Sequence, residues 1–507
     1  MGYLTDRSCY IRGIILLGTS LKMITLDHIC YAYPQSSKEN LNDITMEIQD
    51  GEAVALIGLS GCGKTTITRI LNGLAYKFFS GKMDGCISIN GIDPSKKELH
   101  EIGRMIGSIF QNPKSQFFAE VVEDEIAFGL ENYGFERTEI VKRITDSLRM
   151  INGETLRTRN LFQLSSGERQ KVAIASVNAL DPPVYVFDEP SANLDMASVE
   201  ALKRLMALLK KKGKTLIVSE HRIYYLKDII DRYYYIEDGK IIRCYTKEML
   251  EHSPIEFFRQ QGLRLCSLDR IEPHGKTMSG TQCLKIDNLS FSYSRQSLLE
   301  NLNYCFTSGI IYGIIGGNGA GKSTFAKVLS GLLREKHGSI SSCGKYSCND
   351  IKLNCRTRRK TIYYLSNNLD SNLFEVSATE ELRLNDPAAD AAEILKDYCL
   401  DSVANTHPQI LSGGQKQRLA IAAASLLKRD VYIFDEPTSG LDGKNMRLIA
   451  GKMRELQEHD RIVIVISHDY EFLMEVCSVV LHLKGKSFTE YTVATDKEKI
   501  LNVLQKE

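Results

Sequence analysis

Short apolar runs recur in the same order in two parts of the chain. Residues 53–57 (AVALI) and 311–315 (IYGII) each lead into a glycine-rich segment and then into a helix-like run, TITRILNGL or TFAKVLSGL. Short apolar runs predict buried strands, and apolar positions three and four residues apart predict helices. The order strand, loop, helix, found twice, predicts an α/β fold built from two similar units.

Both glycine-rich segments match G-x-x-x-x-G-K-[ST], a pattern that binds phosphate. Glycines let backbone N–H groups turn inward around a phosphate, and the positive end of the following helix adds to the attraction. Lys64 and Lys322 are expected to reach the terminal phosphates, while Thr65 and Ser323 offer a hydroxyl to Mg²⁺. The predicted nucleotide-binding residues are Gly58, Ser60, Gly61, Gly63, Lys64, Thr65 and Thr66 in the first unit, and Gly316, Asn318, Gly319, Gly321, Lys322, Ser323 and Thr324 in the second.

Two further apolar runs end in a pair of acids, in VYVFDEP (184–190) and VYIFDEP (431–437). Asp188 and Asp435 are predicted to hold Mg²⁺, directly or through water. Glu189 and Glu436 are predicted to act as general bases on the attacking water. One isolated acid pair would more simply cap a helix, but the same pair at the same place in both units favours the catalytic interpretation.

A histidine follows each acid pair at the same distance. His221 and His468 each end an apolar run, 32 residues after the glutamate (221 − 189 and 468 − 436). A lone histidine is more often structural, whereas the matched interval indicates a contact with the terminal phosphate and the attacking water.

The segments LSSGERQ (164–170) and LSGGQKQ (411–417) lie between phosphate loop and acid pair. Together with the other motifs they resemble the nucleotide-binding domains of ABC ATPases, and the resemblance covers the chain from about residue 23 to 490. It implies two tandem P-loop NTPase domains of the ABC type. Each would have a RecA-like core, an antiparallel β subdomain and a helical subdomain that carries the signature.

The resemblance also implies a head-to-tail sandwich in which each signature caps the nucleotide held by the opposite domain, so that the two domains pair within one chain. ATP and Mg²⁺ are the expected ligands. One site would combine Lys64, Gln111, Asp188, Glu189 and His221 with Ser412 and Gly414, and the other would combine Lys322, Asp435, Glu436 and His468 with Ser165 and Gly167. Gln111 would also ligate Mg²⁺, Asp195 and Asp442 would be the D-loop aspartates, and Tyr33 and Tyr293 would stack on adenine.

The sequence suggests four segments. Residues 1–22 are expected to be an N-terminal extension that is disordered or not translated, with Met23 as an alternative start. The first domain would span 23–246 and the second 283–507. Residues 247–282 contain prolines and glycines without a clear counterpart in the repeat, so they are expected to form a flexible linker that spans about 30 to 36 Å.

The stretch FQNPKSQFF (110–118) resembles the Q-loop of the ATPases of energy-coupling factor transporters. Its aromatic pair, Phe117 and Phe118, suggests a surface for a membrane subunit, although both rings could instead pack into their own domain. In the second unit Asn367 replaces Gln111 and is one methylene shorter. The loss of reach predicts unequal sites, with the Lys64 site faster.

These observations favour the ATPase motor of an energy-coupling factor importer of a vitamin or a transition-metal ion, at the cytoplasmic face of the cell membrane and paired with integral-membrane subunits. A fused ATPase of a sugar-type importer is an alternative, and a soluble ABC-F-like translation factor is another. The formal net charge of +1 argues against nucleic acid as a partner. Thirteen cysteines without a CxxC pair fit reduced thiols in the cytosol.

Overall fold

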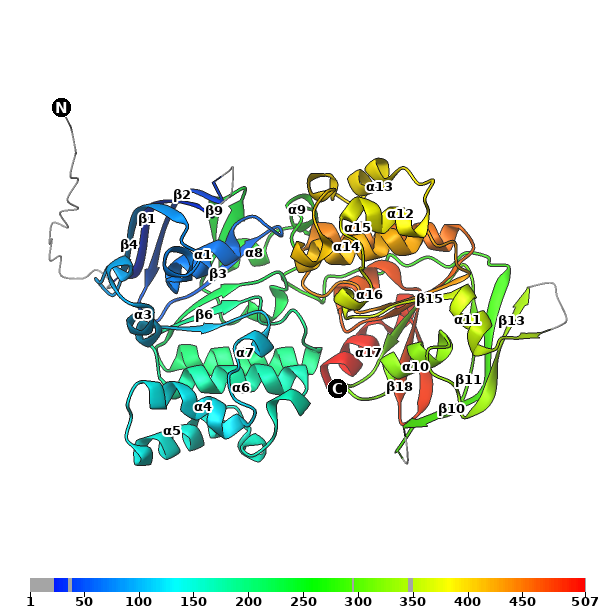
Figure 1. Cartoon of the computed structure of the whole chain (residues 1–507), viewed down its shortest axis with the longest axis horizontal. Coiled ribbons are helices and arrows are strands. Elements are labelled where there is room, and N and C mark those ends of the chain that lie inside the picture. The colour runs from blue at the N-terminus through cyan, green and yellow to red at the C-terminus, as the bar shows by residue number, and fades with distance from the viewer. Residues whose placement is uncertain (1–21, 35–38, 294–295, 345–349, 507) are drawn as a thin grey trace.

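The computed structural model describes residues 22–34, 39–293, 296–344 and 350–506. All but Lys22 of the expected N-terminal extension lies outside these residues. Figure 1 shows two similar halves side by side, with the segment that contains α8 (Lys247–Glu251) and α9 (Ile255–Gln260) passing between them.

Each half is built on a six-stranded sheet in which five strands run parallel and the last is antiparallel. The first sheet has the order β5 (Ile106–Ile109), β6 (Val184–Asp188), β7 (Thr215–Ser219), β3 (Ala53–Gly58), β8 (Arg232–Glu237) and β9 (Lys240–Thr246). The second has the order β15 (Ile362–Leu365), β16 (Val431–Asp435), β17 (Ile462–Ile466), β12 (Ile311–Ile315), β18 (Val479–Lys484) and β19 (Ser487–Thr492). The central strands are fully buried, which explains why they are unbroken apolar runs in the sequence.

An antiparallel sheet covers one side of each central sheet. In the first half it consists of β2 (Leu41–Gln49), β1 (Lys22–Ala32) and β4 (Lys82–Ile89), and in the second of β11 (Gln296–Thr307), β10 (Gln282–Tyr293), β13 (His337–Gly344) and β14 (Ile351–Lys352). The helices α1 (Lys64–Leu71) and α10 (Lys322–Leu329) contribute Ile67 and Phe325 to the apolar clusters between these sheets. The helix that follows each phosphate loop is therefore packed into an apolar layer.

A helical subdomain completes each half. The first contains α4 (Val122–Asn132), α5 (Arg137–Met150) and α6 (Ser166–Ala179), and the second α12 (Ala378–Asn385), α13 (Ala391–Asp397) and α14 (Gly413–Ser425). The remaining helices are α2 (Leu74–Lys77), α3 (Leu99–Met105), α7 (Met196–Lys211), α11 (Cys355–Thr361), α15 (Gly443–Glu458), α16 (Tyr470–Val476) and α17 (Val493–Lys506). The three predicted subdomains are thus present in both halves, and the predicted fold class is confirmed.

The expectation of a flexible linker at 247–282 is wrong. This segment contains α8 and α9, and Leu263, Leu265 and Ile271 are buried in an apolar cluster that continues into both halves. Helix α9 contacts α15, just as α17 at the end of the second half contacts α7 of the first. The linker therefore has a counterpart in the repeat, and burial of its apolar side chains fixes it in place.

One cysteine differs from the expected reduced state. Nine described cysteines are free, but Cys283 is disulfide-bonded. It lies in β10, which pairs with β13. In the described part of the chain, no helix is both long and apolar enough to cross a membrane.

Candidate functional site

The first phosphate loop lies between β3 and α1 and has the backbone that a phosphate cradle needs. Gly63 caps α1 with φ 111°, in the left-handed region, and an added Cβ would lie 2.6 Å from Leu41 Cδ2. Lys64 Nζ donates to the carbonyl oxygens of Gly58 and Leu59, both at 2.9 Å. The lysine is therefore already inside the loop where phosphate oxygens would replace those acceptors.

The second loop repeats this arrangement between β12 and α10. Gly321 caps α10 with φ 101°. Lys322 Nζ donates to the carbonyl oxygens of Gly316 and Gly317, the latter at 3.1 Å. Both lysines are less than 10% exposed, so each positive charge is directed into its loop.

The acid pair of the first half stands at the carboxyl end of β6, beside the phosphate loop. Thr65 Oγ1 donates to Asp188 Oδ1 at 3.1 Å, which places the two expected Mg²⁺ ligands side by side. Gln111 Nε2 donates to Glu189 Oε2 at 2.6 Å. Glu189 has φ 44°, an unusual backbone conformation for a residue with a side chain and one found at functional sites.

The second half differs at this point. Glu436 has the same left-handed backbone, with φ 52°, but among the described residues no hydrogen bond joins it to Asn367. Instead, the hydroxyl of Tyr364 donates to Asp435 Oδ2 at 2.9 Å. Tyr364 occupies the strand position that Ser108 has in β5, so a phenol enters the second acid site and not the first.

The histidines approach the glutamates at unequal distances. His221 Nε2 lies 3.3 Å from Glu189 Oε1, whereas His468 Nε2 lies 3.8 Å from Glu436 Oε1. Both imidazoles are at most 10% exposed. Each half thus brings the predicted glutamate and histidine together, and more tightly in the first.

The glutamates also differ in their electrostatics. Burial alone would raise the pKa of Glu189, but the charges of His221 and Lys64 outweigh it and hold the pKa below its ordinary value. Burial beside Asp435 raises the pKa of Glu436 to about 8. Burial, reinforced by the Lys322 charge, lowers the pKa of His468, so this imidazole is neutral at pH 7.

The aspartates at the ends of β6 and β16 resemble each other more closely. Burial, together with the adjacent Glu189, raises the pKa of Asp188 to about 6, and burial raises the pKa of Asp435 above its ordinary value. Both carboxylates are deprived of water, so a divalent cation would relieve an unfavourable charge at each site.

Contacts between the halves join each phosphate loop to the opposite D-loop. The backbone N–H of Ser60 donates to Asp442 Oδ2 at 2.7 Å, and Asn318 Nδ2 donates to Asp195 Oδ2. Ser439 Oγ donates to the Ala192 carbonyl oxygen at 2.6 Å. These reciprocal contacts are what a head-to-tail pairing requires.

The signature segments cap the helices that follow them. Ser165 Oγ accepts from the Glu168 N–H at 3.2 Å, and the Glu168 carboxylate accepts from the Ser165 N–H at 2.8 Å. Ser412 and Gln415 make the same capping box on α14. The next N–H groups of each helix, which include those of Gly167 and Gly414, have no earlier helical carbonyl to bond and can face an anion.

One cleft of about 960 Å³ brings together parts of both halves. Its walls include Ser165 from the first half and Lys322, Glu436 and His468 from the second. These residues were predicted to share one composite site around Lys322, whereas Gly167, predicted with them, is not among the residues that line the cleft, and the role of the site remains a prediction. The pairing of Lys64 with Ser412 and Gly414 remains a prediction.

The two tyrosines expected at adenine have different surroundings. The Tyr33 hydroxyl accepts from Arg69 Nη1 at 2.9 Å, and its ring meets Tyr31 and Phe79 edge-on. Tyr293 is 48% exposed, with one edge against Phe291. Stacking on adenine remains a prediction for both.

Comparisons with known proteins identify the family. A model of the ABC transporter family matches residues 41–192 and 299–439. A protein of Treponema denticola, provisionally named an ABC transporter ATP-binding protein, is 39% identical over 475 residues, which cover 91% of this chain and 96% of the relative. A Methanosarcina mazei protein with the same provisional name is 32% identical and aligns over 91% of this chain and 87% of its own length.

The chain belongs to the ABC transporter family. Among solved structures, an archaeal ribosome recycling factor, aABCE1, in complex with the ribosomal stalk protein aP1, has a TM-score of 0.66 at 22% identity, over 94% of this chain and 92% of that one. This likeness shows that both chains share the fold of two ABC domains.

Family membership makes the chain an ATPase that uses ATP with Mg²⁺. The residues fit these ligands, because each half offers a glycine loop with a buried lysine beside a hydroxyl and a carboxylate. Thr65 with Asp188 in the first half, and Ser323 with Asp435 in the second, would hold Mg²⁺, which would supply positive charge against the negative charge of the phosphates. In this ABC ATPase, Gln111 and His221 each contact one carboxylate oxygen of Glu189, Oε2 and Oε1 respectively.

Sequence reasoning missed two residues near the ABC site. Tyr364 was hidden because tyrosine is an ordinary strand residue, and only the register of β15 beside β16 places it near Asp435. Arg264 was hidden in the presumed linker, yet it contacts Asp469, 205 positions away. The periodic pattern carried no signal for either residue.

Proposed function

We propose that the chain is the ATP-hydrolysing motor of an energy-coupling factor type importer, which couples ATP binding and hydrolysis to uptake of a vitamin or a transition-metal ion. It would bind separate integral-membrane subunits at the cytoplasmic face of the membrane. ATP binding would close the cleft between the halves, and hydrolysis would open it.

Within this proposal, Lys64 and Lys322 hold the terminal phosphates. Glu189 and Glu436 act as general bases, and the histidines contact the terminal phosphate and the water. Metal ligands would be Thr65, Gln111 and Asp188 in one site and Ser323 and Asp435 in the other. In the first site, the hydrogen bond of 2.6 Å from Gln111 Nε2 to Glu189 Oε2 supports the assignment of both residues to one site.

The observation that carries the membrane assignment is an exposed apolar surface beside each Q-loop. Phe118 is 75% exposed and stacks on Phe128, with ring centroids 4.8 Å apart. At the equivalent positions of the second half, Phe374 is 72% and Leu384 55% exposed. Large exposed apolar side chains that recur in both halves favour a protein partner.

The preceding residue of each pair faces inward. Phe117 packs against the apolar core, and Leu373 is only 4% exposed. The expectation of two exposed aromatics thus holds for Phe118 and not for Phe117. One side chain anchors the loop and the next points to solvent, so a partner that contacts Phe118 can move the segment that ends at Gln111.

Affinity purification of the tagged chain in mild detergent, followed by mass spectrometry, tests the proposal. Small integral-membrane proteins should co-purify, and Phe118→Ser with Phe374→Ser should remove them while ATPase activity remains. Ile242→Ser is the matched control, because Ile242 is 55% exposed on β9. Recovery of ribosomal proteins with an empty membrane fraction would refute the importer and favour a factor that acts on the ribosome.

A further inference from the structure

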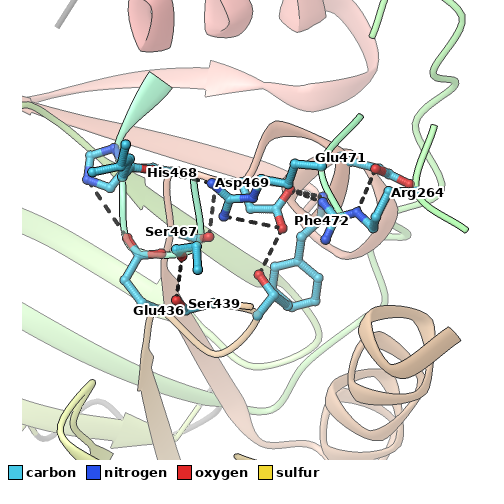
Figure 2. A network of polar contacts seen from close by, with 12 residues as sticks. Arg264, Glu436, Ser439, Ser467, His468, Asp469, Glu471 and Phe472 are labelled. Atoms are coloured by element: carbon cyan, nitrogen blue, oxygen red, sulfur yellow. Dashed lines mark hydrogen bonds and ion pairs between the residues drawn. The ribbon is translucent and has the colours of Figure 1, made fainter. Parts of the chain in front are cut away.

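A buried cluster of charged side chains lies where the linker meets both halves, beside the histidine of the second half (Figure 2). Arg264 comes from the linker, Arg222 from the first half, and Asp469 and Glu471 from the second. None of these four side chains is more than 9% exposed. Two positive and two negative charges balance, as buried charges must.

Arg264 joins the two acids of this cluster. Its Nε donates to Glu471 Oε2 at 2.7 Å, and its Nη2 donates to Asp469 Oδ1. The planar guanidinium has donors on two edges, so it can hold both carboxylates at once, which a lysine ammonium does less well. Arg222 is more distant, with Nη2 at 3.9 Å from Asp469 Oδ2.

Asp469 links Arg264 to the catalytic segments of the second half. Its Oδ2 accepts from Thr438 Oγ1 at 3.0 Å, and Thr438 lies two residues after Glu436. Its own N–H donates to Ser467 Oγ at 3.1 Å, and the intervening residue is His468. The carboxylate of Asp469 is therefore tied to the loops that carry both Glu436 and His468.

We propose that Arg264 is a positioning residue for the Lys322 site, where it fixes the placement of His468 relative to Glu436 through Asp469. In the first half Glu220 makes the comparable tie, because its carboxylate accepts from the N–H groups of Ser191, two residues after Glu189, and of His221, at 3.2 and 2.8 Å. In the described part of the chain no linker side chain bonds Glu220, and Arg222, the residue after His221, donates from Nη1 to the Leu194 carbonyl oxygen at 3.3 Å. The linker thus acts on one of the two sites. This inference rests on the proposed role of His468.

Loss of the guanidinium would leave two buried carboxylates with one distant arginine. Uncompensated buried charge is unfavourable, so the loop would shift toward water. Because His468 is adjacent to Asp469, the shift would move the imidazole. A displacement of about 1 Å at a reacting centre is enough to reduce the rate about a hundredfold.

The test measures each site separately by single-turnover ATP hydrolysis. In a Glu189→Gln background only the Lys322 site turns over, and in a Glu436→Gln background only the Lys64 site does. Arg264→Met should slow ATP hydrolysis at the Lys322 site, measured in Glu189→Gln, by about tenfold or more. It should slow hydrolysis at the Lys64 site, measured in Glu436→Gln, by less than about twofold. An equal loss at both sites, or no loss at the Lys322 site, would overturn the proposal.

Arg264→Lys keeps the test decisive if the methionine variant does not fold. It retains the positive charge, so the thermal midpoint should stay near that of the unmodified chain, while turnover at the Lys322 site falls. Unchanged turnover with Arg264→Lys would mean that charge balance alone matters and would overturn the positioning role.

His468→Ala in the Glu189→Gln background separates the two claims. If it leaves turnover at the Lys322 site unchanged, the proposed role of the histidine fails and this inference fails with it. If His468→Ala slows the site and both Arg264 variants do not, only the positioning role of Arg264 is overturned.

Discussion

Replacing the two glutamates one at a time is expected to have very unequal effects on ATP hydrolysis. Glu189→Gln should remove most of the steady-state ATPase activity, and Glu436→Gln should remove little. The reason lies in the geometry beside each glutamate: Gln111 bonds Glu189 at 2.6 Å, whereas no hydrogen bond within the described residues joins Asn367 to Glu436.

Two effects set the magnitude. Because burial beside Asp435 raises the pKa of Glu436 to about 8, only about one chain in ten has the ionised base at pH 7. Mg²⁺ bound at Asp435 would lower this pKa, so the tenfold loss is an upper value. The shorter side chain of Asn367 can misplace the attacking water, at a further loss of about a hundredfold. The two sites should therefore differ by about 10²- to 10³-fold.

The assay compares phosphate release by the single variants, the double variant and the unmodified chain at saturating ATP and pH 7. Asn367→Gln in the Glu189→Gln background is the matched gain-of-function test and should raise the residual rate about tenfold or more. Equal losses from Glu189→Gln and Glu436→Gln would refute the reasoning, because they would show that the two sites contribute alike.

Three other measurements test the framework around the sites. Leu265→Ala should lower the free energy of unfolding by about 2–5 kcal/mol, because it opens a cavity in the core beneath the linker; circular dichroism would follow unfolding, and an unchanged transition would contradict the buried linker. Asp442→Ala removes the acceptor for the Ser60 N–H, a contact between the two halves, and should raise the ATP concentration needed for half-maximal turnover about fivefold. An unchanged ATP concentration for half-maximal turnover would contradict this pairing of the halves. Burial opposes ionisation of Asp469, but the neighbouring Arg264 and Arg222 charges hold its pKa at about 2, below the ordinary 3.8; this stabilisation is present above pH 3.8 and lost as the pH falls through 2. At pH 7 the free energy of unfolding of Arg264→Met should therefore be about 2 kcal/mol lower than that of the unmodified chain, and this difference should disappear near pH 2. A difference that does not change with pH would contradict the pairing of Asp469 with Arg264.

Local patterns in the sequence were sufficient for the framework of each half. The strands β3 and β12 are buried on both faces, so their residues form uninterrupted apolar runs. The glycine spacing after each strand identifies the phosphate loop, because few other residues tolerate the backbone at Gly63 or Gly321. Buried strands and phosphate loops depend on residues close together in the sequence, so the local pattern of residue types is enough to predict them.

The linker could not be predicted in this way. Leu263 and Leu265 flank Arg264, and this alternation resembles a half-exposed segment. All three side chains are less than 10% exposed. Arg264 can be buried because it pairs with Glu471 in α16 and with Asp469 just before α16, both more than 200 positions along the chain. A buried charge can be recognised only with its partner, and that pairing exists only in the folded molecule.

Fusion of the two halves explains why the sites can differ at all. In a dimer of identical chains every substitution appears in both sites, so a change that slows one site slows the other. Here equivalent positions have diverged. Ser108 in β5 corresponds to Tyr364 in β15, and Arg222, which follows His221, corresponds to Asp469, which follows His468. Arg222 and Asp469 meet at the junction between the halves, where Arg222 Nη2 lies 3.9 Å from Asp469 Oδ2 and the opposite charges attract. In a pair of two identical halves, the same position would bring two arginines or two aspartates together, and their like charges would repel. The same substitution that makes the histidine loops unequal therefore also favours pairing between unlike halves, and this links the asymmetry of the sites to the assembly that contains them.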